Sequence, residues 1–205
     1  MTVPDDPNAT SGTIAFNNCV DIGFTINGSA SFSVSGDPNG NYSASITYNN
    51  LTLNSGMNTA TLNASMGMNG SYNMNTDTDT ITVSYSNFKV TVNNDYINLY
   101  NYKFSGTYNN TTLAYTVTLD CTFDSSFING VVDVLTATPI QGNDGISQNP
   151  ASGSLLIKGA NNTSVQVTIN NTTNVTVTAD LNGDGSYEYS KIMTWSDFDN
   201  TNLLA

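Results

Sequence analysis

Apolar and polar residues alternate along much of this 205-residue chain, and that two-residue period is what most limits its fold. Between residues 59 and 74 the even positions are Ala, Leu, Met, Tyr or Gly, and the odd positions are Thr, Asn, Ser or Gly. From 112 to 123 the odd positions are all apolar. Successive side chains of a β-strand point to opposite faces, so each segment is predicted to be a strand with one apolar and one polar face.

Further segments with this pattern predict the neighbouring strands of the same sheet. They cover about 13–35, 40–54, 80–93, 95–108 and 126–137, with shorter ones near 154–158, 163–170, 173–179 and 186–195. Turn-forming runs of Asn, Asp, Gly and Pro separate several of them. Short turns between long amphipathic strands favour sequential antiparallel pairing, a meander.

The apolar parity changes inside three segments without a turn. The changes fall between Tyr48 and Leu51, between Tyr85 and Phe88, and between Leu99 and Tyr100. A change of parity within one strand predicts either a β-bulge, in which an extra residue restores the apolar side chains to one face, or a strand that bends from one environment to another. Strong curvature of the sheet is expected to follow.

No amphipathic helix of useful length is available to cover the apolar face; only 195–204 could form a short helical turn. We therefore predict an all-β fold, an antiparallel meander forming a strongly curved or barrel-like sheet. A β-sandwich is the alternative. A membrane-spanning barrel is less favoured, because the sequence has no obvious aromatic girdles.

Four parts are expected along the chain. Residues 1–11 hold two prolines and two acids and suggest a flexible tether, and 12–137 form the main β domain. Residues 138–153, with two prolines and three glycines, are predicted to be a connector. Residues 154–205 form a small β subdomain that packs on the main sheet, because so short a segment is hard to stabilise alone.

The charge balance excludes several partners. The net charge is −12, there is no His or Arg, and four lysines are the only cations. Nucleic acids and anionic membranes are attracted by clustered Lys and Arg, so neither is an expected partner. The sequence also has no apolar run long enough for a transmembrane helix.

The two cysteines, Cys19 and Cys121, are predicted to form a disulfide. No CxxC motif and no histidine supports a zinc site, and the composition suits an exported protein. Closing a loop of about 100 residues would stabilise the fold by about 4–5 kcal/mol in the chain-entropy model. Two separate buried thiols are the alternative.

One local motif points to a metal. The spacing Asp-x-Asn-x-Asp-Gly from residue 180 matches the first half of a calcium-binding loop. The predicted ligands are Asp180, Asn182, Asp184, Ser186 and Glu188. The twelfth position, normally a bidentate Glu, is Lys191. A polar hairpin turn without a metal is the alternative, since Asn-Gly and Asp-Gly are strong hairpin signals.

Catalytic residues are not recognisable. A Ser or Cys nucleophile would have no His to activate it. A carboxylate pair for glycoside hydrolysis could come from Asp21, Asp120 and Asp133, although solvated acids on a strand are the more common case. The protein is therefore not expected to be an enzyme.

Tyrosines at one parity suggest a further surface. Tyr100, Tyr102 and Tyr108 alternate with polar residues, together with Phe104. Such a row packs in a core with its hydroxyls at the rim, or it stacks sugars or lines an apolar cavity.

Segments 152–165, 179–188 and 194–198 resemble the C-terminal part of exported β-rich lipoproteins and surface proteins of proteobacteria. The resemblance covers about the last quarter of the chain, and it implies export and attachment to an outer membrane. It supplies no catalytic residues.

The leading prediction is a non-catalytic exported module, structural or binding, at a bacterial outer membrane or cell surface. One alternative is a carrier that holds a lipid or another apolar molecule inside the curved sheet. Another is an assembly or fibre subunit that pairs through a free edge strand.

Overall fold

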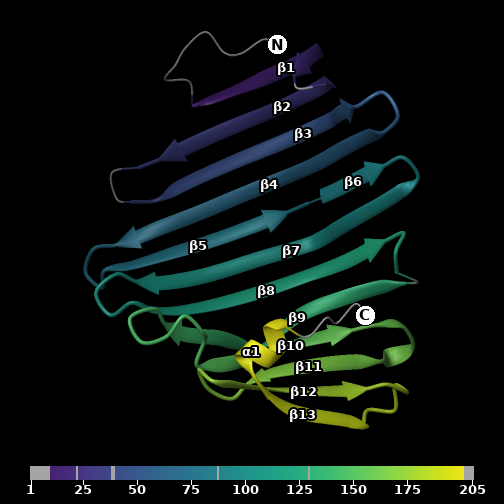
Figure 1. Ribbon diagram of the computed structural model, residues 1–205. Helices are drawn as coiled ribbons and strands as arrows, with labels where there is room; N and C mark the ends of the chain where they lie inside the picture. The colour runs from purple at the N-terminus through teal and green to yellow at the C-terminus, as the bar shows by residue number, and fades with distance from the viewer. Residues whose placement is uncertain (1–9, 22, 38–39, 87, 129, 201–205) are drawn as a thin grey trace.

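The chain folds almost entirely into β-strands, in a computed structural model that describes residues 10–21, 23–37, 40–86, 88–128 and 130–200 (Figure 1). The strands are β1 Ser11–Asp21, β2 Phe24–Gly36, β3 Tyr42–Asn54, β4 Thr59–Asn73, β5 Thr78–Tyr85, β6 Phe88–Val92, β7 Asp95–Asn109, β8 Ala114–Ser125, β9 Val131–Asn143, β10 Ser152–Lys158, β11 Ser164–Ile169, β12 Asn174–Asp180 and β13 Tyr189–Thr194. A single turn of 3-10 helix, η1 (Ala160–Asn162), and one short helix, α1 (Trp195–Asn200), complete the described elements. The predicted all-β class is confirmed.

All thirteen strands belong to one antiparallel sheet. Its order follows the sequence from β1 to β13, except that β5 and β6 lie end to end in one position between β4 and β7. The predicted meander is therefore confirmed. In the described part of the chain, β1 pairs only with β2 and β13 only with β12, so the sheet is open.

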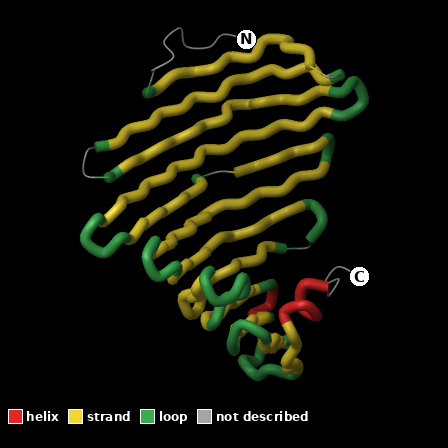
Figure 2. The backbone as a smooth tube through the Cα atoms, turned by 60° about the vertical axis from the view of Figure 1, so that its left-hand side comes forward, coloured by secondary structure: helices red, strands yellow, loops and turns green. Residues whose placement is uncertain are grey.

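From β1 to β8 the sheet is a single layer. In Figures 1 and 2, no helix or second sheet of the described chain lies over these strands. Accordingly, the chain exposes 12,530 Å² of surface, against about 9,300 Å² for a compact monomer of this mass. The expectation that the chain covers its own apolar face is therefore not met for β1–β8.

Several of the most buried residues lie in the C-terminal part, where the sheet curls (Figure 2). Val175 is fully buried, and Ile169 and Ala179 are nearly so. These three share a face, since Val175 pairs with Ile169 and Ala179 with Val165 on the neighbouring strand. Helix α1 closes this part, and the indole N–H of Trp195 donates a 3.3 Å hydrogen bond to the carbonyl of Asn171. Among the described residues, the largest fully buried apolar side chain, Val175, thus belongs to the small C-terminal subdomain, whereas the buried apolar residues of β2 and β4 are the alanines Ala30 and Ala64.

Strand β9 continues to Asn143, so residues 144–151 alone connect it to β10. Strand β9 contains Pro139, which has no amide hydrogen to donate to a neighbouring strand. The pairing of β9 with β8 shifts register between Val117 and Cys121, and proline is tolerated at such an irregularity. Residues 1–9 of the predicted tether lie outside the described residues, and Ser11 already belongs to β1.

The predicted bulges are present and form a line across the sheet. In β3 the register shifts between Tyr48 and Leu51, and Asn50 adopts a positive φ of 46°. The Asn50 N–H donates to Asn63 Oδ1 on β4 at 2.8 Å. In β7 the shift lies between Tyr100 and Lys103.

Strand β1 has an equivalent bulge between Phe16 and Cys19, where the Asn18 N–H donates to Asn27 Oδ1 at 2.7 Å. The junction of β5 and β6 also contains one extra residue. Tyr85 pairs with Met66 and Val90 pairs with Leu62, so five residue steps on β5–β6 lie opposite four on β4. Each bulge keeps the apolar side chains on one face through the change of parity.

The predicted disulfide is wrong, because Cys19 and Cys121 are both free thiols. Cys19 lies in β1 and Cys121 in β8, six strand positions apart. At about 4.8 Å per position the separation is roughly 29 Å, whereas a disulfide requires Cα atoms within about 7 Å. The meander itself therefore rules out the bond.

Candidate functional site

The loop between β12 and β13 begins at Asp180, whose side chain organises it. Asp180 is only 3% exposed. Its Oδ1 accepts the Gly183 N–H at 2.7 Å and its Oδ2 accepts the Gly185 N–H at 2.9 Å. Both glycines have positive φ, which lets the chain turn tightly around the carboxylate. Gly183 also lies so close to the backbone of Asn161 that a side chain there would overlap it.

The other two carboxylates of the loop are exposed and also accept backbone hydrogens. Asp184 Oδ1 accepts the Ser186 N–H at 2.8 Å, and this bond lowers the pKa of Asp184 below its ordinary value. Glu188 Oε2 accepts the Leu181 N–H at 2.7 Å across the loop. Hydrogen bonds to the charged form of Asp184 thus favour its carboxylate.

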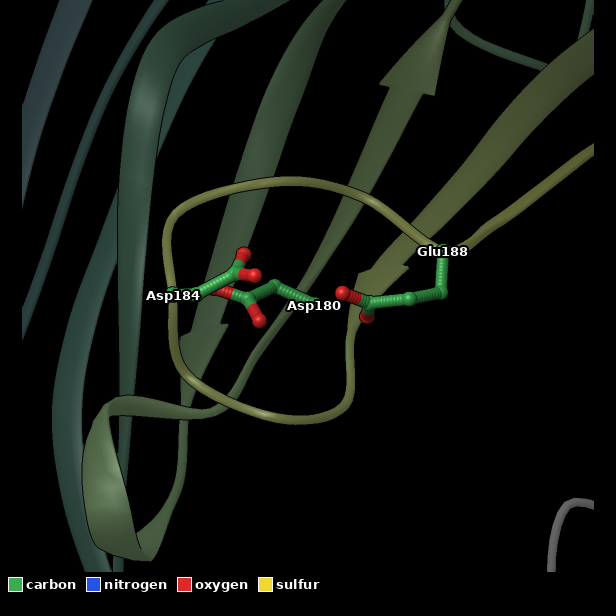
Figure 3. Close-up of side chains that lie close together, drawn as sticks. All are labelled: Asp180, Asp184 and Glu188. Carbon is green, nitrogen blue, oxygen red and sulfur yellow. The ribbon is translucent and has the colours of Figure 1, made fainter.

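The loop brings one oxygen each of Asp180, Asp184 and Glu188 within 4.8 Å of one another (Figure 3). Calcium binds oxygens at 2.3–2.6 Å, so two ligands of one ion can be separated by up to about 5 Å. The three carboxylates therefore fit a single divalent cation by spacing, charge and donor type. A cation bound here would draw its remaining ligands from water or the loop backbone, because calcium takes six to eight oxygens.

Asn182 and Ser186, the other two predicted ligands, form hydrogen bonds with Asp184 inside the loop. Asn182 Oδ1 accepts the Asp184 N–H at 2.8 Å, and its amide nitrogen donates to Asp184 Oδ2 at 3.2 Å. Ser186 contributes its N–H to Asp184. Lys191, at the twelfth position, lies in β13 in register with Val177.

A polar cleft of about 630 Å³ adjoins this loop. Asp133, Lys158, Asp180, Asp184 and Tyr187 are among the residues that line it. The Tyr187 hydroxyl donates to Gln166 Oε1 at 2.9 Å, which fixes the ring at the edge of the cleft. The cleft is thus open to polar molecules and carries both signs of charge.

A second candidate surface is the apolar face of the sheet, which we define as the face of β2–β8 that carries two rows of residues in register. The first row is Phe32, Ile46, Met66, Tyr85 and Tyr102. The second row is Val34, Ala44, Met68, Val83, Phe104 and Leu119. None of the eleven is buried, and Val34 is 52% exposed.

The opposite face carries hydroxyl groups that bond across the strands. Ser33 and Ser45 are 2.8 Å apart through their hydroxyl oxygens, and Ser35 and Ser43 are 2.7 Å apart. These pairs satisfy the polar groups of the single layer without a second layer. The sequence alternation identified the face, but not this pairing.

The charged groups avoid the apolar rows. The polar face carries Lys89, Lys103 and Asp120. Lys89 pairs with Asn63, and Lys103 lies between Ser84 on β5 and Asp120 on β8. Among the described residues, the apolar face carries carboxylates near strand ends, at Asp79 and Asp95, and Asp21 lies on the same side of the neighbouring strand β1. The apolar face therefore presents an uncharged surface across its middle.

The predicted tyrosine row is only partly correct. Tyr102, Phe104 and Tyr108 share the apolar face, but Tyr100 lies on the polar face in register with Thr122. The bulge at Asn101, which has a φ of 54°, separates Tyr100 from the others. Parity alone cannot place residues on the two sides of a bulge.

The acids considered for hydrolysis do not converge. Asp21 lies at the end of β1, whereas Asp120 and Asp133 lie on β8 and β9. Asp21 is therefore six strand positions from β8, too far to act with either of the others on one glycosidic bond. Asp120 and Asp133 lie on neighbouring strands, where Asp120 Oδ1 accepts the Thr136 N–H at 3.0 Å and Asp133 Oδ1 accepts the Thr122 hydroxyl at 2.7 Å.

No helix in the described part of the chain has both the length and the apolar character to cross a bilayer. No family model matches the chain, and no curated protein or solved structure is significantly similar to it.

Proposed function

We propose that this protein is a non-catalytic, exported binding or structural module of a bacterial outer membrane or cell surface, and that it works through the apolar face of its sheet. The observation that carries this proposal is that no other layer of the described chain covers that face, which leaves its residues partly exposed. Large uncovered apolar patches on proteins are typically interaction surfaces. The low charge content and the resemblance of the C-terminal segments to exported surface proteins support the location.

The carrier alternative receives less support from the shape of this face. Two hollows on it, beside Val90 and beside Phe104, measure about 180 and 200 Å³. Pockets that enclose small ligands are typically about 300–1,000 Å³. A flat partner surface fits these dimensions better than an enclosed lipid.

The apolar face can be tested with an environment-sensitive dye in dilute solution. We expect wild-type protein to enhance the dye's fluorescence at least tenfold, and Met68→Lys to reduce that enhancement strongly. Asn69→Lys is the matched control, because Asn69 follows Met68 on β4 but lies on the polar face. Equal dye binding by all three proteins, or none by the dilute wild type, contradicts the proposal.

Location has a separate test. Fractionation of cells that make the protein naturally should recover it with the envelope. Recovery with the cytoplasmic fraction counts against export while leaving the role of the apolar face open.

We also propose that the loop from Asp180 to Glu188 binds calcium. The convergence of three carboxylates within 4.8 Å favours this. Calorimetric titration should give a dissociation constant in the range of extracellular calcium modules, about 10⁻⁴–10⁻³ M. Calcium should also raise the Tm, and a chelator should reverse the rise.

The matched control for the loop is a carboxylate outside it. Asp184→Asn should weaken calcium binding at least tenfold, whereas Asp144→Asn, in the exposed β9–β10 connection, should leave it unchanged. If calcium gives neither a heat of binding nor a change in Tm with the wild-type protein, the loop is a hairpin turn that binds no calcium.

A further inference from the structure

We infer that the apolar face is covered by the same face of a second copy of this chain, so that two single-layer sheets pack into one β-sandwich. The inference rests on the proposed function, because it names the partner of the same surface. The inference is supported by the area of the face, by its flat shape and by the distribution of charge around it.

The face is large enough for a stable dimer. Strands β2 to β8 occupy six positions, and β2, β3 and β4 contain 13, 13 and 15 residues. At about 4.8 Å per position and 3.3 Å per residue, the face measures roughly 29 by 43 Å, or about 1,200 Å². Stable interfaces typically bury about 800 Å² on each partner. Even incomplete overlap of two faces reaches that size.

The apolar face is flat enough to pack against another sheet. The Tyr42 ring lies over Gly70 on the neighbouring strand, and the Tyr115 ring lies over Gly142, so these aromatic rings fill space above a glycine. The two hollows described above, about 180 and 200 Å³, are too small to hold a helix. Two packed sheets lie about 10 Å apart, with the side chains of their inner faces interdigitating.

The charge distribution favours a second copy over a lipid surface. In a face-to-face pair, Lys89, Lys103 and Asp120 stay on the two outer faces, in water. An anionic bilayer would instead meet a surface with carboxylates near its strand ends and no cation in its apolar rows. A neutral apolar surface can also pair with itself about a two-fold axis, which is the commonest symmetry of soluble oligomers.

Sedimentation equilibrium of the full chain tests the inference. We expect a dimer with a dissociation constant at or below the micromolar range. Met66→Lys, at the centre of the first apolar row, should weaken it at least 100-fold. Asn69→Lys, on the polar face of the same strand, should change it less than twofold. Far-ultraviolet circular dichroism establishes that each variant is folded.

A second measurement follows a thiol of the wild-type chain, and a variant is needed only for its control. Cys121 lies on the apolar side of β8, in register with Val134. Its thiol should react with a maleimide at least fivefold faster in dilute monomer than in concentrated dimer. A polar-face thiol introduced by Thr116→Cys should react at one rate in both conditions.

The outcomes separate this inference from the proposed function. A wild-type monomer at millimolar concentration overturns the dimer. If that monomer binds the dye, the apolar face still acts as a binding surface for another partner. If it floats with phosphatidylcholine vesicles, lipid covers the face instead. If it neither binds dye nor floats, the dimer and the proposed function both fail.

Discussion

The ring of Tyr42 lies directly over Gly70 of the neighbouring strand, where any Cβ would overlap the aromatic carbons. The two residues are in register on the apolar face. Tyr115 and Gly142 repeat this relationship on β8 and β9. At both positions the absence of a glycine side chain therefore leaves the space that a tyrosine ring occupies.

Replacing Gly70 should consequently displace the ring. We expect Gly70→Val to destabilise the protein by about 1 kcal/mol, the low end of the cost of added volume, because the displaced atoms are the far end of the partly exposed Tyr42 ring. Gly67→Ala is the matched control on the same strand, since its Cβ would meet only the Ser84 hydroxyl at an ordinary 3.5 Å. Urea denaturation measures both. A loss for Gly67→Ala equal to that for Gly70→Val contradicts the explanation.

The bulge at Asn50 depends on a side-chain acceptor from the next strand. Asn63→Ala removes the Oδ1 atom that accepts the Asn50 N–H at 2.8 Å. We expect a loss of about 0.5–1.5 kcal/mol, typical of one hydrogen bond in a folded protein. Asn69→Ala, on the same face of β4, should cost less than half as much, as judged by the same denaturation assay. Equal losses would mean that the bulge needs no acceptor.

The bulges were predictable because a bulge leaves a parity change in the sequence. Tyr48 and Leu51 show it directly: their parities differ, yet both face the same side. The turn between β1 and β2 leaves no such mark, and the sequence suggested one strand over 13–35. That turn contains Gly23 with a φ of 82° and has no Asn-Gly or Asp-Gly pair.

The candidate sites were predictable to different degrees. The spacing of Asp180, Asp184 and Glu188 is local, and so their convergence followed from it. The pairing of Cys19 with Cys121 depended on the strand order between them, which alternation does not give. Alternation likewise identifies an apolar face but not what covers it, because the covering surface need not belong to the same chain.

The absence of a bond between the two cysteines has a simple consequence. Reducing agent should leave the Tm unchanged within about 1 °C, and a maleimide should label two thiols in the unfolded chain. In the folded protein at neutral pH, Cys121 should label slowly, because burial raises the pKa of its thiol and so lowers the reactive thiolate fraction. Mass spectrometry assigns the label to each cysteine. A large Tm loss on reduction would show that a disulfide forms after all.

Asp77 should make the stability depend on acid pH. It lies in the turn between β4 and β5 and accepts hydroxyl hydrogen bonds from Thr111 at 2.7 Å and from Tyr72 at 2.8 Å. These bonds lower the pKa of Asp77, with Thr111 the larger cause. Because the folded-state pKa is depressed, the stabilisation is present above the ordinary carboxyl pKa of about 3.9. It is lost as the pH falls through the lowered value.

Tyr72 should make the stability depend on alkaline pH. Its hydrogen bond to Asp77 raises the pKa of the phenol, so this contribution is complete below about pH 10 and is lost as the pH rises through the raised value. Tyr72→Phe should therefore flatten the alkaline decline in stability and shift the pKa of Asp77 upward. Tyr189→Phe, an exposed site on β13, should do neither. Carboxyl-carbon NMR titration follows Asp77, and denaturation between pH 2 and 11 follows stability. If Asp77 titrates at the same pH in wild type and Tyr72→Phe, the phenol does not stabilise this carboxylate, and Thr111 and Asn110 must account for its lowered pKa.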